Sequence, residues 1–376
     1  MLGIFAVLLV VFLVHQFHGF LHFGSFSGTK LLDAVRAANL YYLALSLVLI
    51  YACYGIRALR WQVFQHNLGR SRFATIYKMT LAGFGAIFLL GRAGEPARPL
   101  LLARKEKLPI ADMFGIYVLE RLFDTASTAV IAAIALILFE AHAHSGETAA
   151  RLEAAARTAG TLLFAGVLAA IAFLVYLRLH GAAWLESRLA GWLGVAGWRG
   201  SVARILLGFA RGVQTIRSWS DLFLAVFYSA LHWFTIVVIY YLIAHSFGGA
   251  LGTLTIGDAM LVLAFTLVGS TVQLPAVGGG SQVASMLVFT TIFQVETEAA
   301  TVASLVIWMI TFASVSLAGI PLLVSEGFSL GQLRELGQEE KQEETGALPP
   351  GSTQHALDEF PVARHSPPSP SGENRE

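Results

Sequence analysis

Charged residues are scarce in this sequence, and so is cysteine. Only 13% of the 376 residues are Asp, Glu, Lys or Arg, whereas a soluble domain carries roughly 25%. That shortfall excludes an ordinary soluble protein, and a net charge of +1 argues against a basic surface that binds nucleic acid. The single cysteine, Cys53, excludes an intramolecular disulfide framework and a multi-cysteine zinc site.

Familiar motifs of nucleotide binding and hydrolysis are also missing. The sequence contains no Walker phosphate-binding pattern, no His-Glu-x-x-His and no Gly-x-Ser-x-Gly. His142 and His144 have no cysteine or further histidine nearby, so they do not form a metal-ligand pattern. We therefore expect no metal and no cofactor, and no nucleotide-driven pump.

Apolar residues, in contrast, make up 56% of the chain. A bilayer core about 30 Å thick needs about 20 mainly apolar residues per helix. Six segments are predicted to span it: Leu2–Phe17, Asn39–Ile56, Phe114–Phe139, Thr158–Leu177, Leu222–Ala244 and Thr301–Val324. The first could be a signal peptide, but no Lys or Arg precedes it and no Ala-x-Ala site follows, so we expect an uncleaved helix.

Two further apolar regions are predicted to enter the membrane and turn back. Met79–Leu90 lies between Lys78 and Arg92, and about 13 residues at about 1.5 Å each reach only about 20 Å. Met260–Phe293 is long enough to cross, but Leu274–Gly280 interrupts it with one proline and three glycines, which disfavour a helix. This second region predicts two half-helices that meet at a non-helical tip.

The distribution of Lys and Arg tests this topology. With six spans and two hairpins, sixteen of these residues fall on one side of the membrane and four on the other. The sixteen lie in Arg57–Lys78, Arg92–Lys107 and Arg178–Arg217. This asymmetry predicts an inner-membrane protein with both termini in the cytoplasm. A full span at Met79–Leu90 would separate two basic segments onto opposite faces, so the charge count also favours a hairpin there.

The two hairpins would then face in opposite directions, one in each half of the chain. Such a pair is a sequence sign of an inverted repeat with a binding site between the repeats. The predicted fold class is therefore all-α: a polytopic membrane helix bundle with about six full spans, two oppositely facing re-entrant hairpins and a possible inverted repeat. Residues 1–329 form this domain, and residues 330–376, with nine acids and four bases, are predicted to be a disordered cytoplasmic tail.

Three charged residues lie inside the predicted span Phe114–Phe139. Glu120 and Asp124 share one helix face, and Arg121 stands three residues before Asp124. Charge at membrane depth costs a few kcal/mol per residue and suggests function. These residues either line a polar cavity for a charged head group or form an ion pair that tethers helices.

The two predicted hairpin ends carry the remaining candidates. After the first hairpin, the turn Gly91–Pro99 contains two arginines that could bind a phosphate. The alternative is a basic cytoplasmic loop that only sets the orientation of the protein in the membrane. The second tip is polar and uncharged, which suits either a wet cavity or a helix-packing kink. His232 is expected to be a packing residue. The predicted substrate site comprises Arg92, Glu95, Arg98, Glu120, Arg121, Asp124, Gln273, Gly278, Gly279, Gly280 and Gln282.

Five short pieces of the chain resemble the lysylphosphatidylglycerol synthase transmembrane-region family of flippase-like membrane proteins. They are Arg57–Trp61, Gly91–Arg98, Glu120–Asp124, Ser229–Trp233 and Leu274–Gly280, in the order seen in the family. The resemblance covers most of residues 1–327 and implies movement of aminoacylated phospholipid or other lipids between leaflets. Some members carry a cytosolic aminoacyl-transferase domain. Because only a 47-residue tail follows here, the resemblance implies translocation without synthesis.

Two residues differ from the pattern of the family. Gly91 stands where the family often has Pro, and Gln282 stands where it often has Glu. The second difference removes a charge from the expected pathway, which disfavours a cationic aminoacyl lipid. We therefore predict a translocase for a phospholipid, polyprenyl lipid or glycolipid. Its expected partners are membrane lipids, and we expect it to bind no nucleic acid. One alternative function is that of an accessory subunit or enzyme of lipid or glycan biosynthesis. Another is that of a purely structural membrane protein. A biosynthetic enzyme or a second copy of the chain is a further possible partner.

Overall fold

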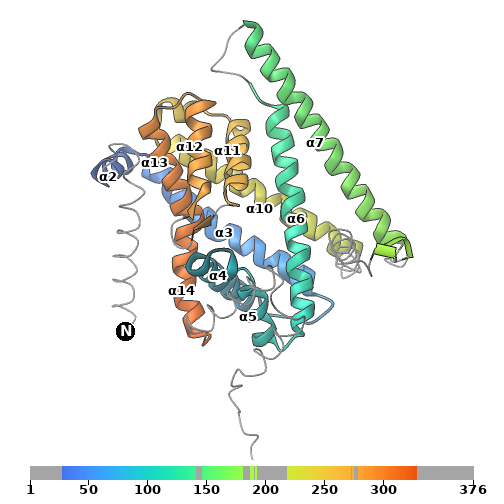
Figure 1. Ribbon diagram of the computed structural model, residues 1–376. Helices are drawn as coiled ribbons and strands as arrows, with labels where there is room; N and C mark the ends of the chain where they lie inside the picture. Colours follow the sequence, from blue (N-terminus) through green and yellow to red (C-terminus); the bar gives the residue numbers. More distant parts are fainter. Residues whose placement is uncertain are drawn as a thin grey trace, which may run out of the picture.

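The computed structural model describes residues 28–140, 146–180, 187–189, 191–192, 218–271, 273–274 and 278–327. Its first half contains α2 (Gly28–Ala37), α3 (Leu40–Gln65), α4 (Phe73–Leu90), η1 (Gly91–Gly94), α5 (Ala97–Glu106), α6 (Ile110–Ile137) and α7 (Gly146–His180). Its second half contains α10 (Trp219–Ser246), η2 (Gly249–Thr253), α11 (Ile256–Gly269), β1 (Gln273–Leu274), β2 (Gly278–Gly279), α12 (Gly280–Thr291), α13 (Thr297–Trp308), η3 (Met309–Ala313) and α14 (Ser314–Ser325). The protein is an all-α bundle (Figure 1), and its only described strands are these two short ones.

The helices confirm a multi-pass membrane protein. Within the described ranges, five helical segments are long and apolar enough to cross a bilayer: Leu40–Gln65, Phe73–Gly94, Ala150–Phe173, Trp219–Ser246 and Thr297–Ser325. α6, at 28 residues, is also long enough, but it carries three charged residues in its middle. The predicted span Leu2–Phe17 and the predicted tail 330–376 lie outside the described residues, so these two expectations and the count of six spans stay predictions.

The first hairpin is built differently from the expected one. α4 begins at Phe73 and has 18 residues, because the exposed Lys78 does not end the helix. The predicted length was therefore wrong, since α4 is by itself about long enough to cross. The chain nevertheless turns back after η1, because Gly94 lies against Ala86 and Arg98 lies against Gly83. Both ends of this hairpin meet as well, where Gly69 contacts Leu108.

The second hairpin has the predicted form of two half-helices around a non-helical tip. α11 and α12 pack side by side, and Gly269 lies against Gly280 and Ala284. At the tip, β1 pairs antiparallel with β2, with Gln273 opposite Gly279. Gly279 has φ +103°, a conformation that residues with a Cβ rarely adopt.

The two halves of the bundle repeat the same arrangement in opposite directions. α3 and α10 are antiparallel, because the Asn39 amide donates to the Ser246 carbonyl at 2.7 Å and Arg60 donates to Ser229 at 2.9 Å. Each of these helices is followed by a hairpin and then by a long helical segment. α6 packs on α11 of the second hairpin, and α14 packs on α4 of the first. This exchange of contacts is the arrangement expected of an inverted repeat.

The hairpins therefore enter from opposite ends of the bundle and meet inside it. The first begins beside the end of α3, whereas the second begins beside the end of α10. Because α3 and α10 are antiparallel, these two ends are far apart. The tips come together where β1 contacts η1. The fold thus places two non-helical turns, one from each half, beside the same interior region.

Candidate functional site

A cavity of about 390 Å³ lies beside the two hairpin tips. Its wall is formed by α3, α4, η1, α5 and α6 from the first half and by α10 to η3 from the second. Among the residues that the structure describes, all of the charged lining residues come from the first half. They are Arg57, Arg92, Glu95, Arg98, Arg121 and Asp124.

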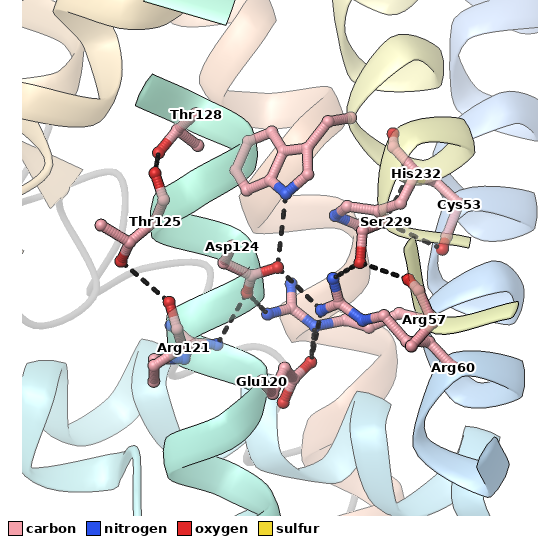
Figure 2. Close-up of polar contacts among 12 residues, drawn as sticks. Cys53, Arg57, Arg60, Glu120, Arg121, Asp124, Thr125, Thr128, Ser229 and His232 are labelled. Atoms are coloured by element: carbon pink, nitrogen blue, oxygen red, sulfur yellow. Dashed lines mark hydrogen bonds and ion pairs between the residues drawn. The ribbon is translucent and has the colours of Figure 1, made fainter. Parts of the chain in front are cut away.

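A cluster of ion pairs between α3 and α6 lies at the charged side of the cavity (Figure 2). Arg57 donates from Nε to Oε1 of Glu120 at 2.6 Å and from Nη2 to Oδ2 of Asp124 at 2.7 Å. Arg60 donates from Nη2 to both carboxylates, at 3.1 Å and 2.7 Å. The two arginines lie one turn apart on α3 and the two acids one turn apart on α6, so each pair faces the other.

Arg98 joins this cluster from α5. Its guanidinium forms an ion pair with Glu120 and lies 4.2 Å from the centroid of the Trp61 ring. Only 4% of Arg98 is exposed. The sequence placed Arg98 in a basic turn, but the hairpin returns as a helix and carries this side chain into the interior. The alternative of a loop arginine that only contacts lipid phosphates is therefore wrong for Arg98.

Arg57 and Arg60 are the site residues that the sequence prediction missed. Both were counted as cytoplasmic-side bases because the predicted span ended at Ile56. α3 instead continues to Gln65, and its two arginines are buried, at 7% and 0% exposure. Without these two and Arg98, thirteen bases remain on the predicted cytoplasmic side against four, so the charge asymmetry persists. Their spacing at i and i+3, directly after an apolar helix, was the signal that could have identified them.

Three other charged residues of the lining are more exposed than the buried cluster and make fewer contacts. Glu95 accepts a hydrogen bond from the Tyr117 hydroxyl. Arg121 lies 3.5 Å from Asp124, and its guanidinium lies 5.2 Å from the Tyr117 ring centroid. Arg92 is exposed, and its side chain makes no hydrogen bond or ion pair within the described ranges. Arg92 and Arg121 therefore keep donors that a bound anion could use.

The second tip contributes an uncharged wall. Gln282 is 3% exposed and lines the cavity, and its Oε1 accepts hydrogen bonds from the Gly279 amide at 2.8 Å and the Ser281 hydroxyl at 2.9 Å. Gly280 begins α12, and Gly278 pairs with Leu274 at the tip. Gln273 is placed by its backbone in β1, and its side chain is outside what the structure describes. The structure therefore brings the predicted residues of both tips to one region.

α10 supports the cluster from the opposite side. The indole Nε1 of Trp233 lies 3.3 Å from Oδ1 of Asp124. The buried His232 has Nδ1 3.0 Å from Sγ of Cys53, and both residues are labelled in Figure 2. His232 thus makes the packing contact expected of it and also reaches the cavity wall. Among the described residues, no group of three His, Cys, Asp or Glu side chains could hold a metal ion.

The lone thiol offers a direct test of this packing. Cys53 is fully buried between α3 and α10, and a thiol that reagents cannot reach is unreactive. We expect N-ethylmaleimide to leave the folded protein in detergent unlabelled while it labels the denatured protein completely, as measured by mass spectrometry. Rapid labelling of the folded protein would show that the α3–α10 contact opens.

Comparison with known proteins adds one finding to this geometry. The sequence matches the family model described as "Lysylphosphatidylglycerol synthase TM region" over residues 1–319. This match contains every residue of the cluster and both hairpins. A search of curated proteins finds no match to the chain.

Proposed function

Because the chain belongs to the lysylphosphatidylglycerol synthase transmembrane-region family, we propose that it is an integral membrane lipid translocase. It moves the head group of a phospholipid, polyprenyl lipid or glycolipid between the two leaflets. The observation that carries this proposal is the charged cavity at the meeting point of two hairpins that enter from opposite ends. Family membership by itself supports only a membrane protein in a lipid-related process.

The geometry supports translocation in two ways. Each hairpin connects the cavity with a different end of the bundle, so movement of one tip or the other could open the cavity to one leaflet at a time. Buried arginines also suit a phosphate, which guanidinium binds through paired hydrogen bonds. Glu120 and Asp124 hold Arg57 and Arg60 in fixed orientations. The carboxylates therefore position the arginines, and the arginines hold the head group.

We place the protein in the inner membrane with both termini in the cytoplasm, from its distribution of Lys and Arg. Membrane lipids are its partners in this proposal, alongside a second copy or a biosynthetic enzyme. A role as an accessory subunit that presents lipid to such an enzyme is the competing proposal. Both roles use the same cavity, so transport by the purified protein distinguishes them.

The test is lipid translocation in liposomes that contain only the purified protein. Labelled lipids in the inner leaflet are protected from a membrane-impermeant quencher, so the loss of protection measures the rate. Arg98→Ala removes a cavity arginine but leaves Arg57 and Arg60 to balance Glu120. We expect the rate to fall by about 10- to 100-fold, since a charge-assisted hydrogen bond contributes about 1.5–3 kcal/mol.

Arg151→Ala is the matched control, because Arg151 pairs with Glu147 on the exposed surface of α7. It should move lipid at the unaltered rate. Unchanged transport in Arg98→Ala and in Glu120→Gln would contradict the assigned site. Lipid binding without translocation by the unaltered protein would overturn the translocase proposal in favour of the accessory role.

A further inference from the structure

The charged lining of the cavity has an excess of positive charge. Its described lining residues include four arginines and two acids, which gives a net charge of +2. Behind them, Arg60 and Glu120 compensate each other. His232 also lines the cavity and is counted as neutral, as an ordinary histidine is at pH 7.

This excess is not compensated by other described parts of the protein. The lining residues contributed by the second half, α10 to η3, are all uncharged once His232 is neutral. Gln282 is one of them, and a carboxylate at its position would have reduced the excess by one. Part of this excess is buried, because the three buried arginines of the cluster face only two buried acids, and charge away from bulk water is costly unless it is paired. The rest comes from Arg92 and Arg121 against Glu95, on more exposed side chains. A bound anion is therefore the partner that this lining lacks.

Donors for such an anion face the cavity. Nη1 of Arg57 donates no hydrogen bond within the described ranges, although Nε and Nη2 are both used. The Arg121 side chain also lines the cavity and is 43% exposed, and Arg92 is an exposed residue of the lining. Three guanidinium groups, from α3, η1 and α6, thus line the cavity in which an anion would bind. A phosphate with three terminal oxygens offers enough acceptors for them.

We propose that the ligand of this cavity ends in a phosphate monoester. The inference rests on the proposed translocase function and narrows its substrate class. A phosphate monoester carries about −1.5 to −2 at pH 7, which matches the lining. A phosphodiester lipid carries only one negative charge, a zwitterionic lipid carries none, and an aminoacylated lipid adds a cation. A terminal monoester is the head group that neutralises the arginines.

An apolar wall beside the arginines identifies the source of this phosphate as a lipid. Phe84, Trp308 and Phe312 line the same cavity. The Phe312 ring centroid lies 6.5 Å from that of Phe84 and 6.2 Å from that of Trp308. Such a continuous aromatic surface favours the start of an alkyl or prenyl chain, which inorganic phosphate and glycerol 3-phosphate do not have.

The test compares two lipids with the same chains, labelled phosphatidic acid and labelled phosphatidylglycerol, in the same proteoliposomes. At pH 7.5 we expect phosphatidic acid to move at least about tenfold faster, because it carries the second charge. This ratio should shrink as the pH falls toward 5.5, since the monoester takes up a proton near pH 6 and the diester does not. Equal rates at pH 7.5 would overturn the monoester assignment while translocation itself stands. Movement of neither lipid, nor of any other labelled lipid, would instead overturn the proposed function.

Two variants test whether the lining charge sets this preference. Arg121→Gln removes one positive charge, and Gln282→Glu adds a negative charge while it keeps the acceptor used by Gly279 and Ser281. Each should lower the ratio of phosphatidic acid to phosphatidylglycerol transport by about tenfold. The surface variant Arg151→Gln should leave it unchanged. Ratios that stay at the unaltered value in both cavity variants would overturn the proposal.

A competition experiment distinguishes a lipid phosphate from a free one. Inorganic phosphate and glycerol 3-phosphate are added to the proteoliposomes during transport of phosphatidic acid. We expect weak inhibition, because neither compound can occupy the aromatic wall formed by Phe84, Trp308 and Phe312. Inhibition by a soluble phosphate at the same concentration as the lipid would overturn the assignment to a lipid.

Discussion

Replacing Glu120 with alanine is expected to lower the free energy of unfolding by about 3–5 kcal/mol, because it leaves buried charge uncompensated. Glu120 is 1% exposed and accepts hydrogen bonds from Arg57 at 2.6 Å and Arg60 at 3.1 Å, in addition to its ion pair with Arg98. Asp124 would then be the one acid of the cluster left to balance these three guanidinium groups. Denaturant titration in detergent, with labelling of Cys53 as the readout, measures the loss.

Glu147→Ala serves as the control for this variant. Glu147 also pairs with an arginine, at 2.5 Å, but both side chains are more than three-quarters exposed. Exposed ion pairs contribute little, so this change should leave the titration midpoint almost unaltered. Similar midpoints for Glu120→Ala and Glu147→Ala would contradict a dry, tightly paired cluster.

A second variant separates the structural from the functional role of this cluster. Glu120→Ala combined with Arg98→Met removes one acid and one base, so the net charge of the interior is the same as in the unaltered protein. We expect much of the stability to return, since a buried ion pair can often be replaced by apolar side chains. Transport should stay low, because a cavity arginine is missing. Full transport by the double variant would show that the cluster only tethers helices.

The sequence located most of the helices but predicted two of them, α3 and α4, to be shorter than they are. The predicted spans stopped at the first charged residue, at Ile56 before Arg57 and at Met79 after Lys78. α3 instead runs on to Gln65, and α4 starts already at Phe73. A lone charge ends an apolar run in the sequence, but it does not end a helix when the side chain finds a partner or reaches solvent.

The candidate site was predictable where charge interrupts an apolar helix. Glu120, Arg121 and Asp124 stood out for that reason, and the structure places all three at the cavity or directly behind it. Their partners Arg57 and Arg60 did not stand out, because a basic residue after a span is what orientation in the membrane already requires. Only the packing of α3 against α6 and α10 distinguishes a buried arginine from a loop arginine.

The contact between the two halves depends on glycine. α4 of the first hairpin crosses α14 where Gly85 and Gly319 meet. A Cβ added at Gly319 would lie 1.9 Å from the Leu81 carbonyl oxygen and 3.0 Å from the Gly85 amide nitrogen. Both neighbours are backbone atoms, so no side chain can move aside to make room. Small residues allow helix backbones this close in membranes, where close packing is a main source of association.

Gly319→Ala is therefore expected to lower the free energy of unfolding by about 1–3 kcal/mol or more, because α4 and α14 must separate. Gly166→Ala is the matched control: Gly166 lies on α7 with no atom within 4 Å of an added Cβ, so alanine there should stabilise the helix slightly. Gly83 of α4 contacts Arg98. Displacement of α4 should therefore also shift this arginine and slow lipid transport. If Gly319→Ala unfolds and transports like Gly166→Ala, then α4 and α14 do not cross as closely as the structure places them.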